Sequence, residues 1–124
     1  MHWSQKYLTL SHVPGEFDCS DLVKRVLLDE RGHTVDLPSE RQWRRWTPDR
    51  LVDTVSGQFV EVSTPQEFDV VLMGYQGRVQ SLGCHVGVFA QCAGQDWVLH
   101  TMEHSGTVFG RLVDLGVYAL KVQG

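Results

Sequence analysis

The sequence lacks any apolar run long enough to span a bilayer, and its first ten residues lack the continuous apolar segment of a secretory signal peptide. It also lacks an excess of basic residues, since 11 Lys and Arg against 15 Asp and Glu give a formal net charge of -4. We therefore expect neither a membrane span nor nucleic acid as a partner. Repeats, linkers and low-complexity tracts are absent too, which predicts a single domain over residues 1–124.

Cysteine is scarce, with three residues at positions 19, 84 and 92, and no Cys-x-x-Cys pair occurs. Three cysteines cannot all pair within one chain, and 42% hydrophobic residues can build a core without disulfides, so we expect reduced thiols. His100 and His104 would share a face only on a helix, which the Ser-Gly pair after them disfavours. We therefore expect no metal and no cofactor. A zinc module remains an alternative, with Cys84, His85, Cys92, His100 and His104 as its possible ligands.

A helix is predicted from Asp18 to about Arg31, where Gly32 provides the C-terminal stop. Apolar residues recur at helical spacing from position 19 onward, so Cys19 lies on the inward face. Asp18 can cap the first turn, and the amides and partial positive charge at a helix start lower the pKa of a thiol. Cys19 is therefore either a nucleophile or a small, inert core residue.

Two of the six histidines interrupt apolar strands: His85 begins residues 85–89, and His100 ends residues 97–100. A thiol nucleophile needs a base within hydrogen-bonding reach and a third polar group that orients the base. On a strand, His85 shares a face with Gly87, which would leave room beside the imidazole for another group. The alternative is a pair of satisfied, partly buried rings without a chemical role.

The order of the predicted elements indicates the fold class. A short helix in the first ten residues, the helix at 18–31 and a helix from Thr47-Pro48 to Gly57 all precede the strands. Helices followed by strands are typical of an α+β fold, with an antiparallel sheet packed on the cysteine helix. The strands are predicted at residues 59–62, 69–75, 85–90, 97–101 and 117–122.

Basic and aromatic residues cluster in one place, residues 41–46. Such a cluster would bind a sugar polymer or an acidic partner. Alternatively, it would form a solvated helix face with its tryptophans packed on the core. The residues are Arg41, Trp43, Arg44, Arg45 and Trp46.

Several motifs resemble those of one family. Residues 17–20, Phe-Asp-Cys-Ser, followed by Leu-Val, resemble the nucleophile motif of the NlpC-type, papain-like cell-wall cysteine peptidases. Residues 65–73 resemble the family's strand entry, residues 85–88 its catalytic histidine motif, and Leu99-His100 its third polar residue. The motifs stand in the family's unpermuted order, and the resemblance covers residues 3 to about 122.

The resemblance implies a papain-like NlpC-type fold and a peptidase or amidase. Cys19 would attack an amide carbonyl, His85 would take and return the proton, and His100 would orient His85. The N–H of Cys19 would be one oxyanion donor, as a helix start permits. The implied substrates are peptidoglycan stem peptides, cut at bonds next to D-amino acids.

Within that family, the chain is most similar to phage tail-tip and tail-assembly peptidases, which have a tryptophan-led first helix and Val-Pro-Gly-Glu-Phe-Asp-Cys before the nucleophile. This similarity implies a virion protein made in the host cytoplasm without a signal peptide and acting at the periplasm or cell wall. Other tail-tip or baseplate proteins would be its partners. The alternative is a weakly active or inactive structural component that keeps the fold for assembly.

Three departures from the family's pattern accompany the resemblance. His12 stands where many relatives carry a tyrosine of the oxyanion site or pocket, and it either replaces that donor or marks lost activity. Asp21 stands where relatives often have a glycine. Glu67-Phe68-Asp69 replaces the proline-glycine before the strand aspartate, a change that we expect to affect only a turn.

Overall fold

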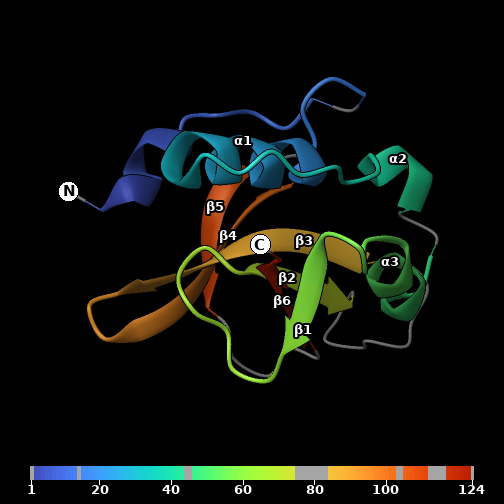
Figure 1. Cartoon of the computed structure of the whole chain (residues 1–124). Coiled ribbons are helices and arrows are strands. Elements are labelled where there is room, and N and C mark those ends of the chain that lie inside the picture. Colours follow the sequence, from blue (N-terminus) through green and yellow to red (C-terminus); the bar gives the residue numbers. More distant parts are fainter. Residues whose placement is uncertain are drawn as a thin grey trace.

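The computed structural model describes residues 2–13, 15–43, 46–74, 84–102, 105–111 and 117–123. Within them, helices precede strands, as predicted, and the fold is a mixed α and β arrangement with an antiparallel sheet (Figure 1). The helical elements are the 3-10 helix η1 (Trp3–Tyr7) and the α-helices α1 (Cys19–Arg31), α2 (Glu40–Trp43) and α3 (Pro48–Thr54). The strands are β1 (Phe59–Val62), β2 (Val70–Gly74), β3 (Cys84–Cys92), β4 (Gln95–Met102), β5 (Gly106–Arg111) and β6 (Val117–Val122).

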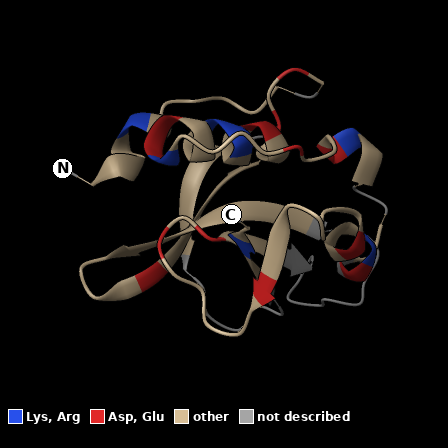
Figure 2. Ribbon diagram, viewed as in Figure 1, with Lys and Arg blue, Asp and Glu red and all other residues tan. Residues whose placement is uncertain are grey.

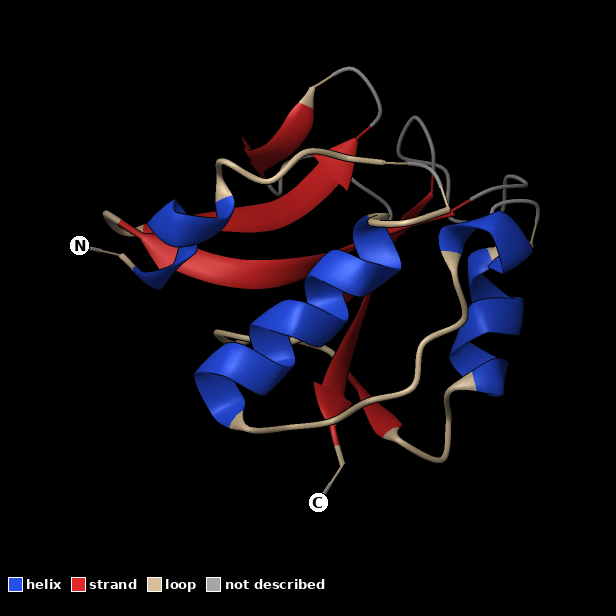
Figure 3. Cartoon of the chain, turned by 90° about the horizontal axis from the view of Figure 1, so that it is seen from above, coloured by secondary structure: helices blue, strands red, loops and turns tan. Residues whose placement is uncertain are grey.

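The sheet has the strand order β1-β6-β2-β3-β4-β5, so the last strand lies between the first two. Its centre is a row of buried apolar residues, in which Val70 faces Leu120 on one side and Val88 on the other, and Val88 faces Leu99. Helix α1 lies across the sheet and packs against β3 and β4 (Figures 1 and 3). The predicted packing of the cysteine helix on an antiparallel sheet is confirmed.

Helix α1 has the predicted bounds because both of its ends are capped. The Asp18 carboxylate accepts the amides of Ser20 and Asp21, and Asp21 in return accepts the amide of Asp18 at 3.0 Å, which completes a capping box. Gly32 ends the helix with a φ of 68°, a left-handed conformation that glycine adopts without strain. Asp21, the departure from the family's glycine, therefore stabilises the helix that carries Cys19.

The first ten residues form one 3-10 turn, η1, rather than a longer helix. Its polar N-terminus is capped by His2, whose Nδ1 accepts the amide of Ser4. Tyr7 is 2% exposed, and Trp3 and Leu10 pack partly buried against the core, so the turn covers the core as predicted. Ser4 and Tyr7, the buried residues of η1, lie three positions apart, and 3-10 geometry brings such residues onto one side.

Strand β5 was not expected from the sequence. Its six residues include Gly106 and Gly110, which weaken a strand pattern, yet β5 pairs with β4 and places Phe109 opposite Leu99.

Strands β3 and β4 also run longer than predicted, because Ala93 and Gly94 both have a positive φ and form a tight two-residue hairpin turn. Strand β2 begins at Val70, not at residue 69, and residue 75 lies outside the described residues.

The cluster at residues 41–46 is partly a one-turn helix, α2, with a buried tryptophan. Trp43 is fully buried, whereas Arg41 is exposed, and Arg44 and Arg45 lie outside the described residues. Trp46 is partly buried, and the Arg50 guanidinium stacks 4.1 Å from its ring centroid. The interpretation that the tryptophans fold onto the core is confirmed for Trp43.

In Figure 2 acidic and basic residues alternate along α1, without a patch of one sign there.

None of the helices in the described part of the chain is long and apolar enough to cross a membrane. Cys19 and Cys92, the two cysteine side chains that the structure describes, are not joined in a disulfide.

Candidate active site

Cys19 is the first residue of α1 and lies next to an imidazole. Its Sγ, a carboxylate oxygen of Glu40 and a ring nitrogen of His85 all lie within 4.8 Å of one another. The thiol comes from α1, the imidazole from the start of β3, and the carboxylate from the start of α2. The fold thus brings together Cys19 and His85, two predicted site residues that are 66 positions apart in the sequence.

His85 is hydrogen-bonded to His100, the third predicted site residue. Nε2 of His85 lies 2.8 Å from Nδ1 of His100, and the two rings stand at 84° to each other. The room expected above Gly87 is filled by β4: a Cβ there would lie 2.4 Å from Val98 Cγ1 and 3.2 Å from His100 Cβ. Gly87 therefore does not leave an open slot beside His85 but allows β4 to bring His100 close to it.

The electrostatics of the site favour neutral imidazoles. Burial, and to a smaller extent repulsion from His100 and His12, lowers the pKa of His85 to about 3. Burial also lowers the pKa of His100. At neutral pH the His85 ring is uncharged, so one of its nitrogens carries a lone pair that can accept a proton.

Glu40 is a site residue that the sequence analysis missed. Its amide donates to Asp18 Oδ2 at 3.0 Å, so the carboxylate that caps α1 also holds the start of α2. Burial raises the pKa of Asp18, the residue that joins these two helix starts. Ser39 and Gln42 match a capping-box spacing, with the Ser39 amide donating to Gln42 Oε1 at 2.9 Å. This signal predicts a helix start at Glu40 but not its place beside Cys19.

Two buried hydrogen bonds hold α2 against α1. Ser20 Oγ donates to the carbonyl of Pro38 at 2.8 Å and accepts the indole N–H of Trp43 at 2.9 Å. The same indole nitrogen lies 2.7 Å from the Pro38 carbonyl oxygen. Ser20 follows Cys19 directly, so this network fixes the segment that carries Glu40 relative to the thiol.

His12 joins the site through Glu40. Its Nε2 lies 3.0 Å from Glu40 Oε2, and its side chain is 6% exposed. Its other ring nitrogen, Nδ1, is buried and has no hydrogen-bond partner within the part of the chain that is described. A buried nitrogen without a partner is unfavourable unless a ligand satisfies it. His12, predicted as an oxyanion or pocket residue, therefore lies in the site with one nitrogen available.

Of the zinc ligands considered from the sequence, His85 and His100 lie close together, whereas Cys92 lies far from His85. Cys92 ends β3 and His85 is its second residue, so seven residues, or about 23 Å of strand, separate them. The side chain of Cys84 and all of His104 lie outside the described residues. The extended strand is the physical reason why Cys92 cannot share a metal centre with His85.

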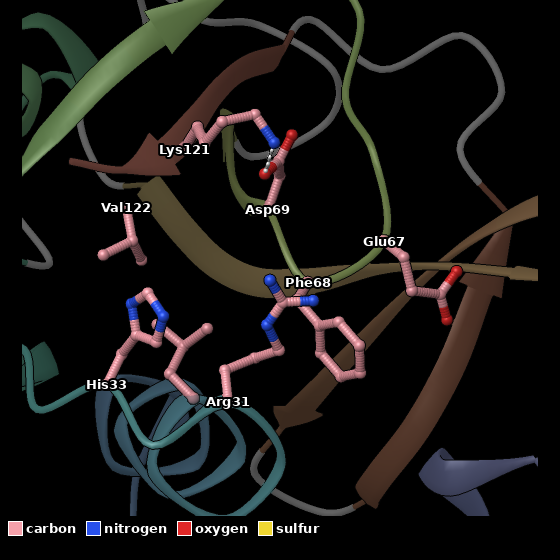
Figure 4. A pocket seen from close by; sticks show the side chains of 8 residues that line it. Arg31, His33, Glu67, Phe68, Asp69, Lys121 and Val122 are labelled. Carbon is pink, nitrogen blue, oxygen red and sulfur yellow. Dashed lines mark hydrogen bonds and ion pairs between the residues drawn. The ribbon is translucent and has the colours of Figure 1, made fainter. Parts of the chain in front are cut away.

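A pocket of about 310 Å³ lies at the other end of α1, away from Cys19 (Figure 4). Arg31, the last residue of α1, and His33 line one side of it, and Lys121 forms an ion pair with Asp69 in the opposite wall, at 2.8 Å. The Arg31 guanidinium stacks 5.4 Å from the ring centroid of Phe68, whose φ is 72°. Residues 67–69 form the expected turn, which lines this pocket and not the cysteine site.

Comparisons with protein-family models and with curated protein sequences found no match. The geometry around Cys19 and the sequence motifs are therefore the grounds for assigning a function.

Proposed function

We propose that the protein is a cysteine peptidase or amidase with a papain-like NlpC-type fold, and that Cys19 is its nucleophile. The observation that carries the proposal is that a His85 ring nitrogen lies within 4.8 Å of the Cys19 sulfur and that His85 is hydrogen-bonded to His100. Nucleophile, base and orienting group in this order are the arrangement that acyl transfer requires. The motifs around Cys19 and His85, which resemble those of the NlpC-type peptidases, support the same assignment.

In the proposed reaction, the Cys19 proton passes to His85 as the sulfur attacks the carbonyl carbon of the scissile amide. The oxygen of the tetrahedral intermediate accepts a hydrogen bond from the amide of Cys19 at the helix start, and a second from Nδ1 of His12 when that ring is doubly protonated, since Nε2 already donates to Glu40. His85 then gives its proton to the departing amine, and a thioester to Cys19 remains. Water attacks the thioester with His85 as base, and release of the acid restores the thiol.

His100 acts as a positioning residue in this scheme. Its hydrogen bond occupies Nε2 of His85, which leaves Nδ1 to exchange the proton with Cys19. Burial keeps His85 neutral but also makes it a weak base, so the hydrogen bond to His100, which shares the charge that His85 gains in the transition state, supports the proton transfer. The proposed substrates are peptidoglycan stem peptides, and the proposed place of action is the cell wall, reached as part of a phage tail tip with other tail-tip or baseplate proteins.

A second candidate is a tail-tip component that keeps the fold for assembly and cleaves nothing. Two observations favour it: Cys19 is 0% exposed, and the Glu40 carboxylate lies beside its thiol. A substrate carbonyl reaches a fully buried sulfur only when neighbouring groups move aside. The two candidates differ in one property, turnover, which is directly measurable.

The test is hydrolysis of purified peptidoglycan stem peptides, followed by mass spectrometry of the products. The wild-type protein should cleave them, and Cys19→Ala and His85→Gln should each lose at least about 100-fold in rate. Cys92→Ser is the matched control, because this thiol is far from His85 on the same strand and should keep wild-type activity. The wild-type protein is first freed of any bound metal with a chelator. If it is folded and still gives no products, the structural role is favoured.

A further inference from the structure

The three side chains that meet at Cys19 are also a set of metal ligands. Thiolate, imidazole and carboxylate are the groups that Zn²⁺ binds in proteins, and sites with three protein ligands leave a fourth position for water. We propose that Cys19, Glu40 and His85 bind one Zn²⁺ ion, which blocks the thiol reversibly. The site differs from the set considered from the sequence, with which it shares only His85.

The distances are compatible with one ion. A tetrahedral Zn²⁺ with bonds of about 2.3 Å to sulfur and about 2.0 Å to nitrogen and oxygen holds its ligand atoms about 3.5 Å apart. The three atoms lie within 4.8 Å of one another, so they would approach by no more than about 1.3 Å. Rotation of the Glu40 side chain, which is 19% exposed, can supply this movement.

The groups that usually support a metal ligand are already in place. Protein ligands of zinc are themselves hydrogen-bonded, a histidine through its second ring nitrogen and a carboxylate through its second oxygen. Nε2 of His85 is bonded to His100, and Oε2 of Glu40 is bonded to His12, so the ion would take the second ring nitrogen and the second carboxylate oxygen.

Charge also matches the ion. A thiolate and a carboxylate together carry two negative charges, which a divalent cation neutralises. On binding, Cys19 loses its proton to solvent and its sulfur becomes a ligand instead of a nucleophile. The site itself does not depend on the proposed function, but the inhibition of cleavage does rest on it.

The test uses the full chain, first treated with a chelator. Added Zn²⁺ should bind at one ion per chain by calorimetry, and Co²⁺ in its place should give the charge-transfer band of a cobalt–thiolate bond. Cys19→Ser should abolish the band, and Glu40→Gln should weaken binding at least about tenfold. Cys92→Ser, the control, should leave the band and the affinity as in the wild type.

A band that survives Cys19→Ser, or an affinity unchanged by both Glu40→Gln and His85→Gln, would overturn the proposal. Circular dichroism establishes that each variant is folded before the comparison. Protein that cleaves stem peptides after chelation but binds no Zn²⁺ contradicts the zinc site alone. Protein that binds Zn²⁺ through these residues but cleaves nothing after chelation contradicts the peptidase assignment alone.

Discussion

Nε2 of His85 lies 2.8 Å from Nδ1 of His100, and the two rings meet edge to face. The two residues stand on neighbouring strands, and the glycine two positions after His85 lets the strands approach closely enough for this contact. In a hydrolase, such a contact fixes the orientation of the base and selects which nitrogen faces the nucleophile.

Replacement of His100 should slow catalysis without weakening substrate binding. In chelator-treated protein, His100→Ala is expected to lower kcat at least about tenfold and to leave KM nearly unchanged, because His100 acts only through His85. His100→Asn, whose amide can still bond to His85, should recover part of the loss. Equal losses in both variants, or a change confined to KM, would contradict a positioning role.

The stability of the protein should fall in acid because of His85. Its pKa is about 3 in the folded state and 6.5 in the unfolded chain, so the unfolded state binds more protons between these values. The stability contributed by a neutral His85 is therefore present above pH 6.5 and is lost as the pH falls towards 3. Urea unfolding of chelator-treated protein gives the free energy of unfolding at each pH between about 4 and 7. This free energy should change less with pH for His85→Gln than for the wild type.

The network that holds α2 on α1 should be sensitive to Ser20. Ser20→Ala removes the hydroxyl between the partly buried Pro38 carbonyl and the buried Trp43 indole, which stay bonded to each other, and should lower the free energy of unfolding by about 1 kcal/mol. Ser56→Ala, which removes one exposed hydrogen bond to Asp53, should change it by less than about 0.5 kcal/mol. Similar urea midpoints for the two variants would show that the network contributes little.

A methyl group at position 87 should disturb the sheet. The Cβ of Gly87→Ala would lie 2.7 Å from the Leu99 carbonyl oxygen, a backbone atom that cannot rotate away. Overpacking of this kind costs about 1 to 3 kcal/mol, and it should also displace His100. Gly57→Ala is the matched control, since its Cβ meets no atom within 4 Å. Thermal denaturation should separate the two variants clearly, and equal melting temperatures would refute the close approach of β4.

Local patterns were sufficient to predict much of the architecture. The helical spacing after Cys19, the capping by Asp18 and the stop at Gly32 gave the bounds of α1, because these are interactions between neighbours in the sequence. The β-branched runs gave five of the six strands for the same reason. Strand β5 was missed because its stability comes from pairing with β4 and not from its own glycine-containing sequence.

The site was predicted less completely than the fold. Cys19, His85 and His100 attract attention because thiols and imidazoles are unusual at the start of a helix or inside an apolar strand. Glu40 does not, because a glutamate after Pro38-Ser39 resembles any exposed helix start. Its position depends on Asp18 and Ser20, which reach across from α1, and no sequence pattern encodes such contacts between distant segments.

The central claim is that Cys19 forms a covalent intermediate with a peptide substrate. The most direct measurement is intact-mass analysis of chelator-treated protein mixed with stem peptides and quenched in acid, with peptide mapping of the adduct. The account predicts an acyl group on Cys19 that is absent from Cys19→Ala and accumulates far more slowly in His85→Gln. An unmodified Cys19 in folded protein, or cleavage that persists in Cys19→Ala, would contradict it.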